Sequence, residues 1–427
     1  MEKFIIDGGY PLRGTVTPSG NKNAALPLLA ACLLTDQPVT LHNVPEIRDV
    51  LTMRALLESL GAEIEAPAPG TLRIQARQVR EADLDPELCR RVRSSILLAG
   101  PLVARTGILH LPPPGGDVIG RRRVDTHILA LRALGAEVEF ERTANIFRFQ
   151  ADGLRGADML LDEASVTATE NAIMAAVTAE GATIIRNAAS EPHVQELCRF
   201  LNVLGAKIQN IGSNTLMIEG VSSLGGGTFT IGPDYLEVVS FIGAAVVTEG
   251  EVRIRNAGLE YLDMIKLVFN RFGITWNEEG TDILVPAGQA LNILPDLDNS
   301  IPEIKVMPWP AFPADLMSIA IVVATQAQGS VLFHDWMYEG RMYFTDKLKK
   351  MGAQIVLCDP HRCIVQGPAQ LYPADVESPD IRAGLSLVLA ALAAKGKSTI
   401  RNAGQIDRGY ERIEEKLKTL GARIERV

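Results

Sequence analysis

Hydrophobic positions along the chain follow a pattern that recurs about every 70 residues. Each copy has an apolar, alanine-rich segment, then a strand in which apolar and polar residues alternate, then an amphipathic segment that ends at a glycine before a second strand. Glycine commonly ends helices because it adopts the left-handed conformation without strain. The repeated glycines are Gly61, Gly135, Gly205, Gly273, Gly352 and Gly421. The pattern therefore predicts six similar α/β units.

The alanine-rich segments indicate where the core lies. Ser95–Ala104, Asn171–Ala179 and Leu316–Thr325 are apolar on every side, and a helix of that kind must be enclosed by protein. We therefore expect buried helices with sheets outside them. The alternating strand that follows often ends in asparagine, at Asn43, Asn187, Asn256 and Asn402.

Six such units fit either one ring or two groups of three. A length of 427 residues favours two groups, since each then has the size of an ordinary domain. The strand-like Phe4–Ile6 has no apolar helix before it, and the last unit ends in a strand at Val427. This suggests that both chain ends belong to one domain. We expect the chain to cross near Ser19–Gly20 and to return near the glycine run 225–227, although an ordinary loop also explains that run.

Composition limits the possible partners and surroundings. The net charge is −9, so nucleic acid is a poor candidate partner, and positive charge for an anionic substrate must be concentrated locally. The N-terminus has no signal-peptide pattern and the apolar stretches are shorter than a membrane span, so we expect a cytoplasmic protein that does not contact a membrane. Five scattered cysteines and six scattered histidines favour reduced, inert thiols and no metal site.

Cationic residues beside buried helices are the first candidates for chemistry. Lys22 stands in the opening turn of an apolar helix, where the helix dipole disfavours a cation unless an anion binds there; a solvated lysine is the alternative. Pro27 fits a first turn better than a helix interior. Arg93 begins another buried segment and suits a two-point contact with carboxylate or phosphate, or a solvated helix end.

Two further segments carry carboxylates. The loop of residues 112–123 joins three prolines, three glycines, Asp117 and three arginines, a composition typical of lids and binding loops as well as ordinary surface loops. Asp315 stands at the start of an apolar helix, where aspartate is a preferred cap. A cap and a catalytic carboxylate are not exclusive.

These segments together resemble one family. Residues 19–27 (SGNKNAALP), 93–96 (RSSI), 114–120 (PGGDVIG), 310–315 (PAFPAD), 339–342 (EGRM) and 406–414 (IDRGYERIE) are similar to motifs of the UDP-N-acetylglucosamine 1-carboxyvinyltransferases. The matches run in order from about residue 4 to residue 427. Any one of them alone is weak, and jointly they are specific.

The resemblance implies a fold and a reaction. The fold is a two-domain inside-out α/β barrel, with residues 21–230 as the domain of the catalytic loop and residues 1–20 plus 231–427 as the second domain. The reaction moves the enolpyruvyl group of phosphoenolpyruvate to the 3-hydroxyl of UDP-N-acetylglucosamine by addition and elimination, and releases phosphate. It is the first committed step of peptidoglycan precursor synthesis and needs no cofactor and no metal.

The resemblance also assigns residues. The catalytic residues implied are Asp117, Asp315, Lys22 and Arg408, of which Lys22 and Arg408, with Arg122, face the phosphate of phosphoenolpyruvate. Asp315 takes up the hydroxyl proton, and Asp117 supplies the acid. The implied substrate-binding residues are Asn23, Arg93, Arg122, Arg123, Val124, Asp125, Thr126, Ala164, Ser165, Val166, Met337, Arg341 and Arg382. Carboxyls in different environments divide acid and base work by their pKa values.

The chain departs from the family pattern at several positions. Asp117 stands where the family usually has cysteine, and a carboxylate is a far poorer nucleophile than a thiolate, so resistance to fosfomycin is expected. Glu163 stands for a usual lysine, Thr167 for a glycine, Tyr235 for an arginine and Arg123 for a proline. Glu163 beside a diphosphate weakens binding by repulsion. The alternatives are therefore a paralogue that has another acceptor or no activity, the shikimate-pathway enolpyruvyl transferase, and a repeat scaffold.

Overall fold

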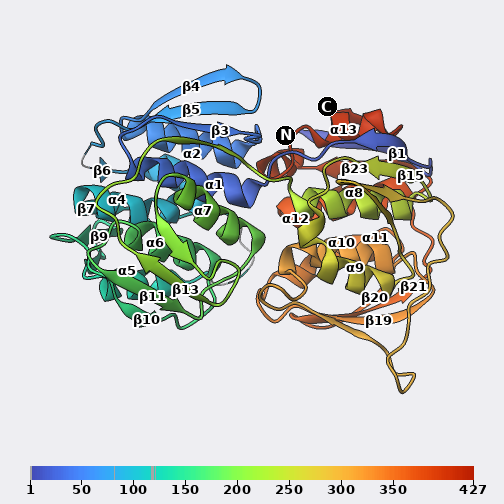
Figure 1. The fold of residues 1–427 in the computed structure, drawn as a ribbon. Coiled ribbons are helices and arrows are strands. Elements are labelled where there is room, and N and C mark those ends of the chain that lie inside the picture. Colours follow the sequence, from blue (N-terminus) through green and yellow to red (C-terminus); the bar gives the residue numbers. More distant parts are fainter. Residues whose placement is uncertain (1, 81, 117–119, 121) are drawn as a thin grey trace. The chain divides into compact units, whose positions relative to one another are not determined.

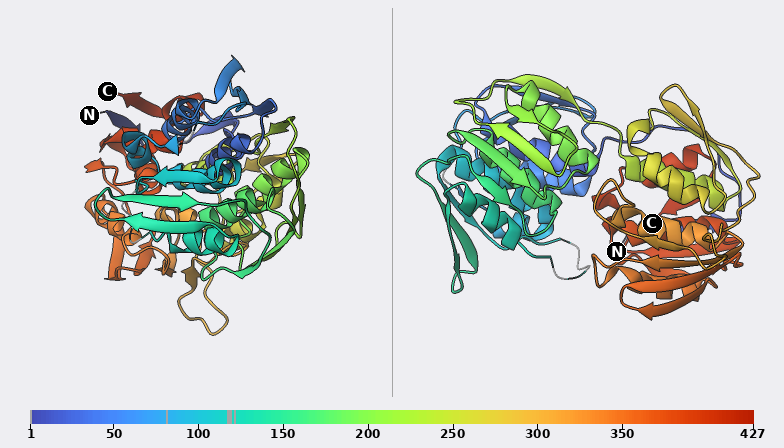
Figure 2. Two further views of the ribbon diagram at one scale, coloured as in Figure 1. Left: turned by 90° about the vertical axis from the view of Figure 1, so that its left-hand side faces the viewer. Right: turned by 60° about the horizontal axis from the view of Figure 1, so that its bottom comes forward.

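The chain folds into two compact units. The computed structural model describes residues 2–80, 82–116, 120 and 122–427; Asp117, the expected acid, lies outside the described residues. Residues 2–19 and 233–427 form unit 1, and residues 20–116 and 122–232 form unit 2. Each unit has its own hydrophobic core. Figures 1 and 2 show that helices within each unit are surrounded by strands.

Six four-stranded sheets repeat one topology, three in each unit. Their orders are β14-β3-β5-β4, β6-β7-β9-β8 and β10-β11-β13-β12 in unit 2, and β2-β15-β17-β16, β18-β19-β21-β20 and β22-β23-β1-β24 in unit 1. In every sheet the first pair is parallel and the two other pairs are antiparallel. The six-unit pattern expected from the sequence is thus confirmed.

The strands of unit 2 are β3 (Val39–His42), β4 (Glu63–Ala68), β5 (Thr71–Gln75), β6 (Ala82–Asp83), β7 (Ile108–Leu111), β8 (Glu137–Glu141), β9 (Ile146–Gln150), β10 (Asp158–Leu160), β11 (Ala182–Arg186), β12 (Lys207–Gln209), β13 (Thr215–Glu219) and β14 (Gly227–Thr230). Those of unit 1 are β1 (Lys3–Gly8), β2 (Arg13–Val16), β15 (Glu251–Ile254), β16 (Asn277–Glu279), β17 (Asp282–Val285), β18 (Glu303–Lys305), β19 (Gly329–His334), β20 (Gln354–Asp359), β21 (Arg362–Gly367), β22 (Asp375–Glu377), β23 (Gly396–Arg401) and β24 (Arg423–Arg426).

Each repeated unit contributes one central helix, and these helices fill the two cores. They are α1 (Lys22–Ala31), α4 (Ala99–Thr106) and α6 (Val166–Ala176) in unit 2, and α8 (Tyr235–Val247), α10 (Met317–Ala324) and α12 (Ile381–Ala393) in unit 1. Every residue of α8 and α10 is buried, as their apolar sequences predict. Pro27 lies inside α1 and not in its first turn, because Asn21 caps the helix six residues earlier by accepting from the amides of Asn23 and Ala24.

The remaining helices are mostly amphipathic or short. They are α2 (Arg48–Ser59), α3 (Pro86–Arg91), α5 (Asp125–Ala133), α7 (Pro192–Val203), α9 (Asp263–Asn270), α11 (Thr345–Lys350) and α13 (Ile413–Thr419), with the 3₁₀ helices η1 (Cys32–Leu34), η2 (Arg93–Leu98), η3 (Leu259–Tyr261), η4 (Ala314–Leu316), η5 (Arg341–Phe344) and η6 (Ala403–Arg408). No helix in the described part of the chain combines the length and the apolar character that a membrane crossing needs.

The repeated glycines and asparagines have a common backbone reason. All six glycines that follow the amphipathic helices have φ between +78° and +102°, the left-handed region in which glycine is unstrained. Asn43, Asn187, Asn256 and Asn402, which follow the repeated strands, have φ between +47° and +58°. Asparagine tolerates this region better than most residues, so the sequence repeat marks a repeated turn.

The chain passes from unit 1 to unit 2 after Ser19, as expected, but it returns after Gly232 and not at the glycine run 225–227. Gly227 begins β14, which pairs with β3 inside unit 2. A Cβ on Gly226 would lie 2.5 Å from the carbonyl oxygen of Pro38. The run therefore allows close backbone approach within unit 2 and is not a flexible crossing.

Both chain ends lie in one sheet of unit 1, as the sequence suggested. Strand β1 pairs with β23 on one side and with β24 on the other, and the amide of Lys3 donates to the carbonyl of Val427 at 2.9 Å. Figure 1 marks the two ends beside this sheet. The first strands of the chain thus complete sheets whose other strands come from the C-terminal half.

Candidate active site

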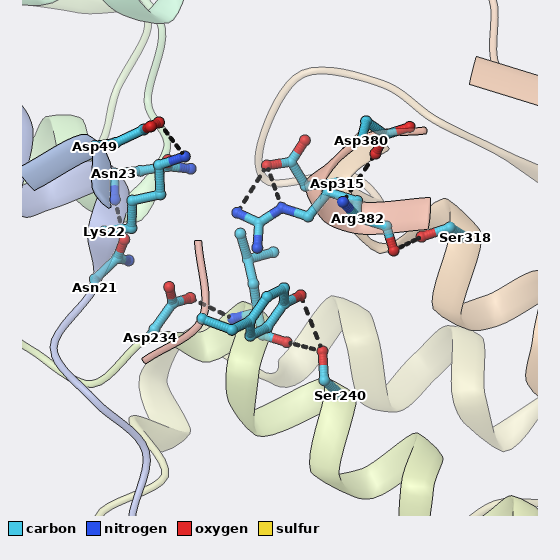
Figure 3. Close-up of polar contacts among 12 residues, drawn as sticks. Asn21, Lys22, Asn23, Asp49, Asp234, Ser240, Asp315, Ser318, Asp380 and Arg382 are labelled. Atoms are coloured by element: carbon cyan, nitrogen blue, oxygen red, sulfur yellow. Dashed lines mark hydrogen bonds and ion pairs between the residues drawn. The ribbon is translucent and has the colours of Figure 1, made fainter. Parts of the chain in front are cut away.

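One carboxylate and two arginines form a cluster in unit 1. Asp315, in η4, contacts Arg341 at the start of η5 through Oδ1 and Nη2 at 2.8 Å. Its other oxygen, Oδ2, contacts Nη2 of Arg382, in the first turn of α12, at 3.2 Å. Figure 3 shows Asp315 against Arg382. Three side chains from separate segments of the chain are therefore held in one hydrogen-bonded group.

The expectation that Asp315 caps its helix is wrong. The residue before η4 is Pro313, the residue before α10 is Leu316, and no side chain caps either helix. The carboxylate turns instead toward the two guanidinium groups. A carboxylate gains more from two charge-assisted contacts than from one backbone amide, which explains why the local preference is overridden.

Arg382 is buried and Arg341 is half-buried, and each guanidinium group has one donor without a partner in the described part of the chain. Arg382 is 7% exposed, and Nη1 of Arg341 and of Arg382 has no hydrogen-bond partner among the described residues. A buried, unmatched cationic donor is costly unless an acceptor arrives. The two Nη1 atoms are thus suited to bind an anion, and a small cavity lined by Arg341, Arg382, Asp380 and Ser318 adjoins them.

Aromatic rings and a helix cap hold the two guanidinium groups in place. Arg341 lies over the ring of Tyr338, with Cζ 4.6 Å from the ring centroid, and Arg382 lies 5.4 Å from that of Tyr410. Asp380 caps α12 by accepting from the amide of Arg382 at 2.8 Å. Burial pulls the pKa of both arginines down, but Asp315, Tyr338 and Tyr410 outweigh it and raise it, so both stay charged.

Lys22 is buried in unit 2 and is not a solvated lysine. It is the first residue of α1, 7% exposed, and its Nζ lies 2.8 Å from Oδ2 of Asp49 on α2 (Figure 3). The neighbouring Asn23 is half-buried, and its amide donates to Asn21 at 2.8 Å. Asp49 offsets the unfavourable position of a cation at the start of a helix. Sequence reasoning missed Asp49, because nothing near it in the chain marks it as a partner.

The arginines expected around the catalytic loop form a second group in unit 2. Arg93, in η2, donates through Nη2 to the carbonyl oxygens of Arg122 at 2.8 Å and of Arg123 at 3.1 Å. Arg123 is exposed and pairs with Asp125 at 3.1 Å and with Asp162 at 3.3 Å. Much of its charge is therefore neutralised by the protein's own carboxylates.

The base of the catalytic loop is held close to the same group. The amide of Gly115 donates to Cys89 at 3.0 Å, and a Cβ on Gly115 would lie 1.8 Å from the carbonyl oxygen of Arg90. Only glycine fits here, which explains one of the loop's three glycines. Asp117, which follows two residues later, lies outside the described residues.

The other expected residues lie at the ends of elements. In unit 2, Val124 is half-buried, and Thr126 donates to Asp162 at 2.6 Å. Ala164, Ser165 and Val166 are half-buried at the start of α6. In unit 1, Arg408 ends η6 and donates to Gln405 at 3.2 Å, and the amide of Met337 donates to Asp335 at 3.0 Å. Asp335 is a further residue that no sequence motif pointed to, and Tyr410 lies in the motif of residues 406–414 but had no role assigned to it.

The expectation of inert thiols concerns five cysteines, of which all but the exposed Cys358 are buried. All five cysteines are free, and burial raises the pKa of Cys89 to about 11 and that of Cys198 and Cys363 to about 12. Only a thiolate is strongly nucleophilic, so these side chains are unreactive near neutral pH.

Comparison with known proteins places this fold and site in a family. Residues 6–417 match the family model of EPSP synthase (3-phosphoshikimate 1-carboxyvinyltransferase). In solved structures, the chain is similar over its whole length to the enolpyruvyl transferase NikO from Streptomyces tendae (99% of that chain covered, TM-score 0.89, 24% identity) and to EPSP synthase from Acinetobacter baumannii (100% covered, TM-score 0.77, 19% identity). These likenesses establish the enolpyruvyl transferase fold.

Relatives of higher sequence identity show which branch of the enolpyruvyl transferases the chain resembles. UDP-N-acetylglucosamine 1-carboxyvinyltransferase of Bradyrhizobium diazoefficiens is 58% identical over 100% of this chain and 98% of its own length. The enzymes of the same name from Treponema denticola and Borreliella burgdorferi are 52% and 49% identical, each over 100% of this chain and 99% of their own length. The chain therefore belongs to the enolpyruvyl transferase family, in the branch of the UDP-N-acetylglucosamine 1-carboxyvinyltransferases.

Proposed function

We propose that this protein transfers the enolpyruvyl group of phosphoenolpyruvate to the 3-hydroxyl of UDP-N-acetylglucosamine and releases phosphate, the first committed step of peptidoglycan precursor synthesis. The observation that carries the proposal is the Asp315 cluster. A carboxylate held by the buried Arg382 and the half-buried Arg341, each with an unpartnered donor, provides a base beside a site for an anion. Phosphoenolpyruvate is an anionic enol phosphate. The addition of a hydroxyl to it needs a base for the hydroxyl proton and a site that binds the anion.

The proposed steps balance as an addition followed by an elimination. The acceptor oxygen forms a bond to C2 of phosphoenolpyruvate while its proton passes to Asp315, and C3 receives a proton from Asp117. In the second step C3 returns a proton to Asp117, the bond from C2 to the phosphate oxygen breaks, and phosphate leaves with the proton that Asp315 had taken up. Arg341 and Arg382 hold substrate anions through their free donors, and the full charge of the buried Arg382 stabilises the negative charge of the intermediate.

Cationic groups are proposed to bind the leaving phosphate, and an overlapping set to bind the nucleotide. Lys22, Arg122 and Arg408 face the phosphate, and Lys22 exchanges its contact with Asp49 for that anion. The proposed nucleotide set is Arg122, Arg123, Val124, Asp125, Thr126, Ala164, Ser165 and Val166. Asn23 helps to position the reacting centre, Arg93 helps to hold the substrates, and Met337 is a further substrate-binding residue. Arg93 supports this set by fixing the backbone of Arg122 and Arg123.

The proposal includes the organisation of the chain. We assign residues 21–230, with the catalytic loop, to one domain and residues 1–20 with 231–427 to the other. Phosphoenolpyruvate and the nucleotide sugar are the small-molecule partners. A cytoplasmic location stays a prediction, which fractionation of cells expressing the protein would test.

Phosphate release tests the function. The purified protein is mixed with phosphoenolpyruvate and either UDP-N-acetylglucosamine or shikimate 3-phosphate. We expect phosphate with the nucleotide sugar and none with shikimate 3-phosphate, and mass spectrometry of the product should show a gain of one enolpyruvyl group. Release with shikimate 3-phosphate alone would assign the protein to the other branch, and no release with either acceptor would indicate a non-catalytic paralogue.

A further inference from the structure

A chain of hydrogen bonds runs from the core of unit 2 to the first turn of α6. It joins Asn171 on α6, His127 on α5 and Thr167 on α6. The Nδ2 of Asn171 lies 2.8 Å from Nδ1 of His127, and Nε2 of His127 lies 3.1 Å from Oγ1 of Thr167. Asn171 and His127 are buried, whereas Thr167 is half-buried. The chain therefore ends at a side chain that solvent or a ligand can reach.

The direction of the first hydrogen bond follows from the partners of Asn171. The amide N–H of Gly100 can only donate, and it donates to Oδ1 of Asn171 at 2.8 Å. The carbonyl of Ile96 can only accept, and it accepts from Nδ2 at 2.8 Å. The orientation of the amide is thus fixed, and the second hydrogen on Nδ2 is donated to His127. Nδ1 of His127 is therefore an acceptor.

The second hydrogen bond is directed by the charge state of His127. The ring is 1% exposed, and burial together with Arg93 lowers the pKa of His127 to about 3, so the ring is neutral in any ordinary buffer. A neutral imidazole whose Nδ1 accepts carries its hydrogen on Nε2. His127 therefore donates to the oxygen of Thr167.

Thr167 must then donate its own hydrogen outward. Its oxygen receives from His127, and its hydroxyl hydrogen has no acceptor among the described residues. One cation, Arg93, lies close enough to lower the pKa of His127, and the first turn of α6 holds no acidic residue. The nearby Asp162 is already engaged by Thr126 and Arg123. An anionic oxygen is the partner that fits such a position.

We propose that Thr167 is a specificity-determining residue that donates a hydrogen bond to an oxygen of the diphosphate of the nucleotide-sugar acceptor. This inference rests on the proposed function, in which residues 164–166 bind that nucleotide. The exposed Glu163 repels the same diphosphate. Thr167 offsets this repulsion with a donor that the usual glycine at this position lacks.

Two substitutions test the role of the hydroxyl. Thr167→Val keeps the shape and removes the donor, whereas Thr167→Ser keeps the donor. In the valine variant we expect the inhibition constant of UDP to rise about tenfold, the effect of one hydrogen bond to a charged group, while that of uridine stays unchanged. The KM for UDP-N-acetylglucosamine should rise similarly with little change in the KM for phosphoenolpyruvate. The serine variant should retain wild-type values.

The outcomes separate this inference from the function on which it rests. Wild-type turnover with UDP-N-acetylglucosamine, combined with an unchanged inhibition constant of UDP in Thr167→Val, would overturn the role of Thr167 alone. An equal loss for UDP and uridine would also overturn it, because it would indicate a general distortion of the site. Absence of wild-type turnover would refute the function itself. Nitrogen-15 spectra of His127 should show hydrogen on Nε2 between pH 6 and 8, and hydrogen on Nδ1 would break the argument.

Discussion

At the scale of single residues, the side chains of the Asp315 cluster are held firmly by one another, yet each of its two arginines keeps one donor without a partner among the described residues. Removing two guanidinium groups from water costs several kcal/mol each, and one carboxylate compensates only part of that cost. Stacking on Tyr338 and Tyr410 supplies more, yet one donor on each arginine remains unmatched. The site is therefore prepared for an anion before any substrate binds, which is the arrangement that electrostatic catalysis requires.

Replacing Asp315 should separate catalysis from folding. Asp315→Asn keeps the size of the side chain but removes the base, so we expect kcat to fall by about 10² to 10⁴. Stability should fall by about 1 kcal/mol, since Asp315 is partly exposed and water replaces some of the lost charge compensation. Steady-state kinetics and urea unfolding measure the two effects. Asp346→Asn, which breaks an exposed ion pair with Lys349, serves as the control, and equal kcat values for the two variants would contradict the role of Asp315.

Asp117 determines the expected response to an epoxide inhibitor. A carboxylate opens an epoxide far more slowly than a thiolate, so incubation with fosfomycin should leave the activity of the protein unchanged. Asp117→Cys should instead lose activity with time and with a saturating dependence on inhibitor concentration. The measurement is residual phosphate release after dilution, with mass spectrometry for the adduct. Time-dependent inactivation of the unmodified protein would refute the prediction.

The residues that sequence reasoning identified differ from those that it missed in whether the neighbouring sequence marks them. Lys22, Asp315 and Arg341 stand in motifs whose composition is locally unusual. Asp49 acts through a partner far along the chain and carries no local signal. Tyr410 stands in the motif of residues 406–414, but its contact with Arg382 depends on the fold. The cap assigned to Asp315 failed for the same reason, because the local preference was outweighed by Arg382, 67 residues away.

At the scale of elements, one anchor holds the segment that leaves unit 1. The amide and hydroxyl of Ser19 donate to Glu237 on α8 at 2.7 Å and to Glu411 at 2.6 Å. Lys416 on α13 donates to Glu237 and to Ser19 at 2.6 Å each. Glu237 is 2% exposed, so Lys416 supplies its main compensating charge.

Removing this lysine should therefore destabilise unit 1. Lys416→Met leaves the carboxylate of Glu237 without its cation, and we expect a loss of about 2 kcal/mol, reduced from the value for a fully buried pair because Lys416 is partly exposed. Lys418→Met, on the exposed face of the same helix, should change stability by less than about 0.5 kcal/mol. Urea unfolding compares the two variants, and equal losses would contradict the anchor.

Glu170 on α6 should make stability depend on pH. Burial, with a smaller effect of Glu191, raises its pKa well above the 4.5 of an exposed glutamate. The folded protein thus keeps the proton to a higher pH than the unfolded chain, so this residue lowers stability as pH rises above about 4.5 until the raised pKa is passed. Glu170→Gln should remove this decline, whereas Glu180→Gln, at an exposed position, should not. The free energy of unfolding is measured for both variants between pH 5 and 8. A decline of stability with pH that is unchanged in Glu170→Gln would refute the prediction.

The elements themselves were predictable because their signals are short-range and repeated. Apolar helices, alternating strands and the glycines at positive φ are each encoded within about ten residues, and six copies reinforce one another. The return crossing was misplaced because glycine serves close backbone approach as well as flexibility. Only the partner, here Pro38, distinguishes the two uses.

At the scale of the whole molecule, the two units differ in how their strands are supplied. Every strand of the three sheets of unit 2 lies between residues 20 and 232. Unit 1 takes β1 and β2 from the start of the chain, and β1 occupies an interior place between β23 and β24. The strands of unit 2 therefore come from one continuous stretch of the chain, whereas those of unit 1 come from two separate stretches.

Fragments of the chain should reflect this difference. We expect residues 20–232 to unfold cooperatively in urea as an independent domain, and residues 233–427 to stay unfolded because an interior strand is missing. Attaching residues 1–19 after Val427 through a short glycine-serine linker should restore folding, since Lys3 and Val427 are hydrogen-bonded neighbours. Circular dichroism follows all three fragments, and cooperative unfolding of residues 233–427 alone would contradict the expectation.

The place of β1 also sets an order on synthesis in the cell. The ribosome makes this strand before its partners β23 and β24, and at roughly 5–20 residues per second the interval is roughly 20–80 s. Unit 2 is translated within that interval and can close on its own. The apolar residues Phe4, Ile5 and Ile6 meanwhile have no partner strand. The nascent chain therefore carries an open strand until β23 and β24 have emerged, and the sheet that these strands share with β1 closes only then.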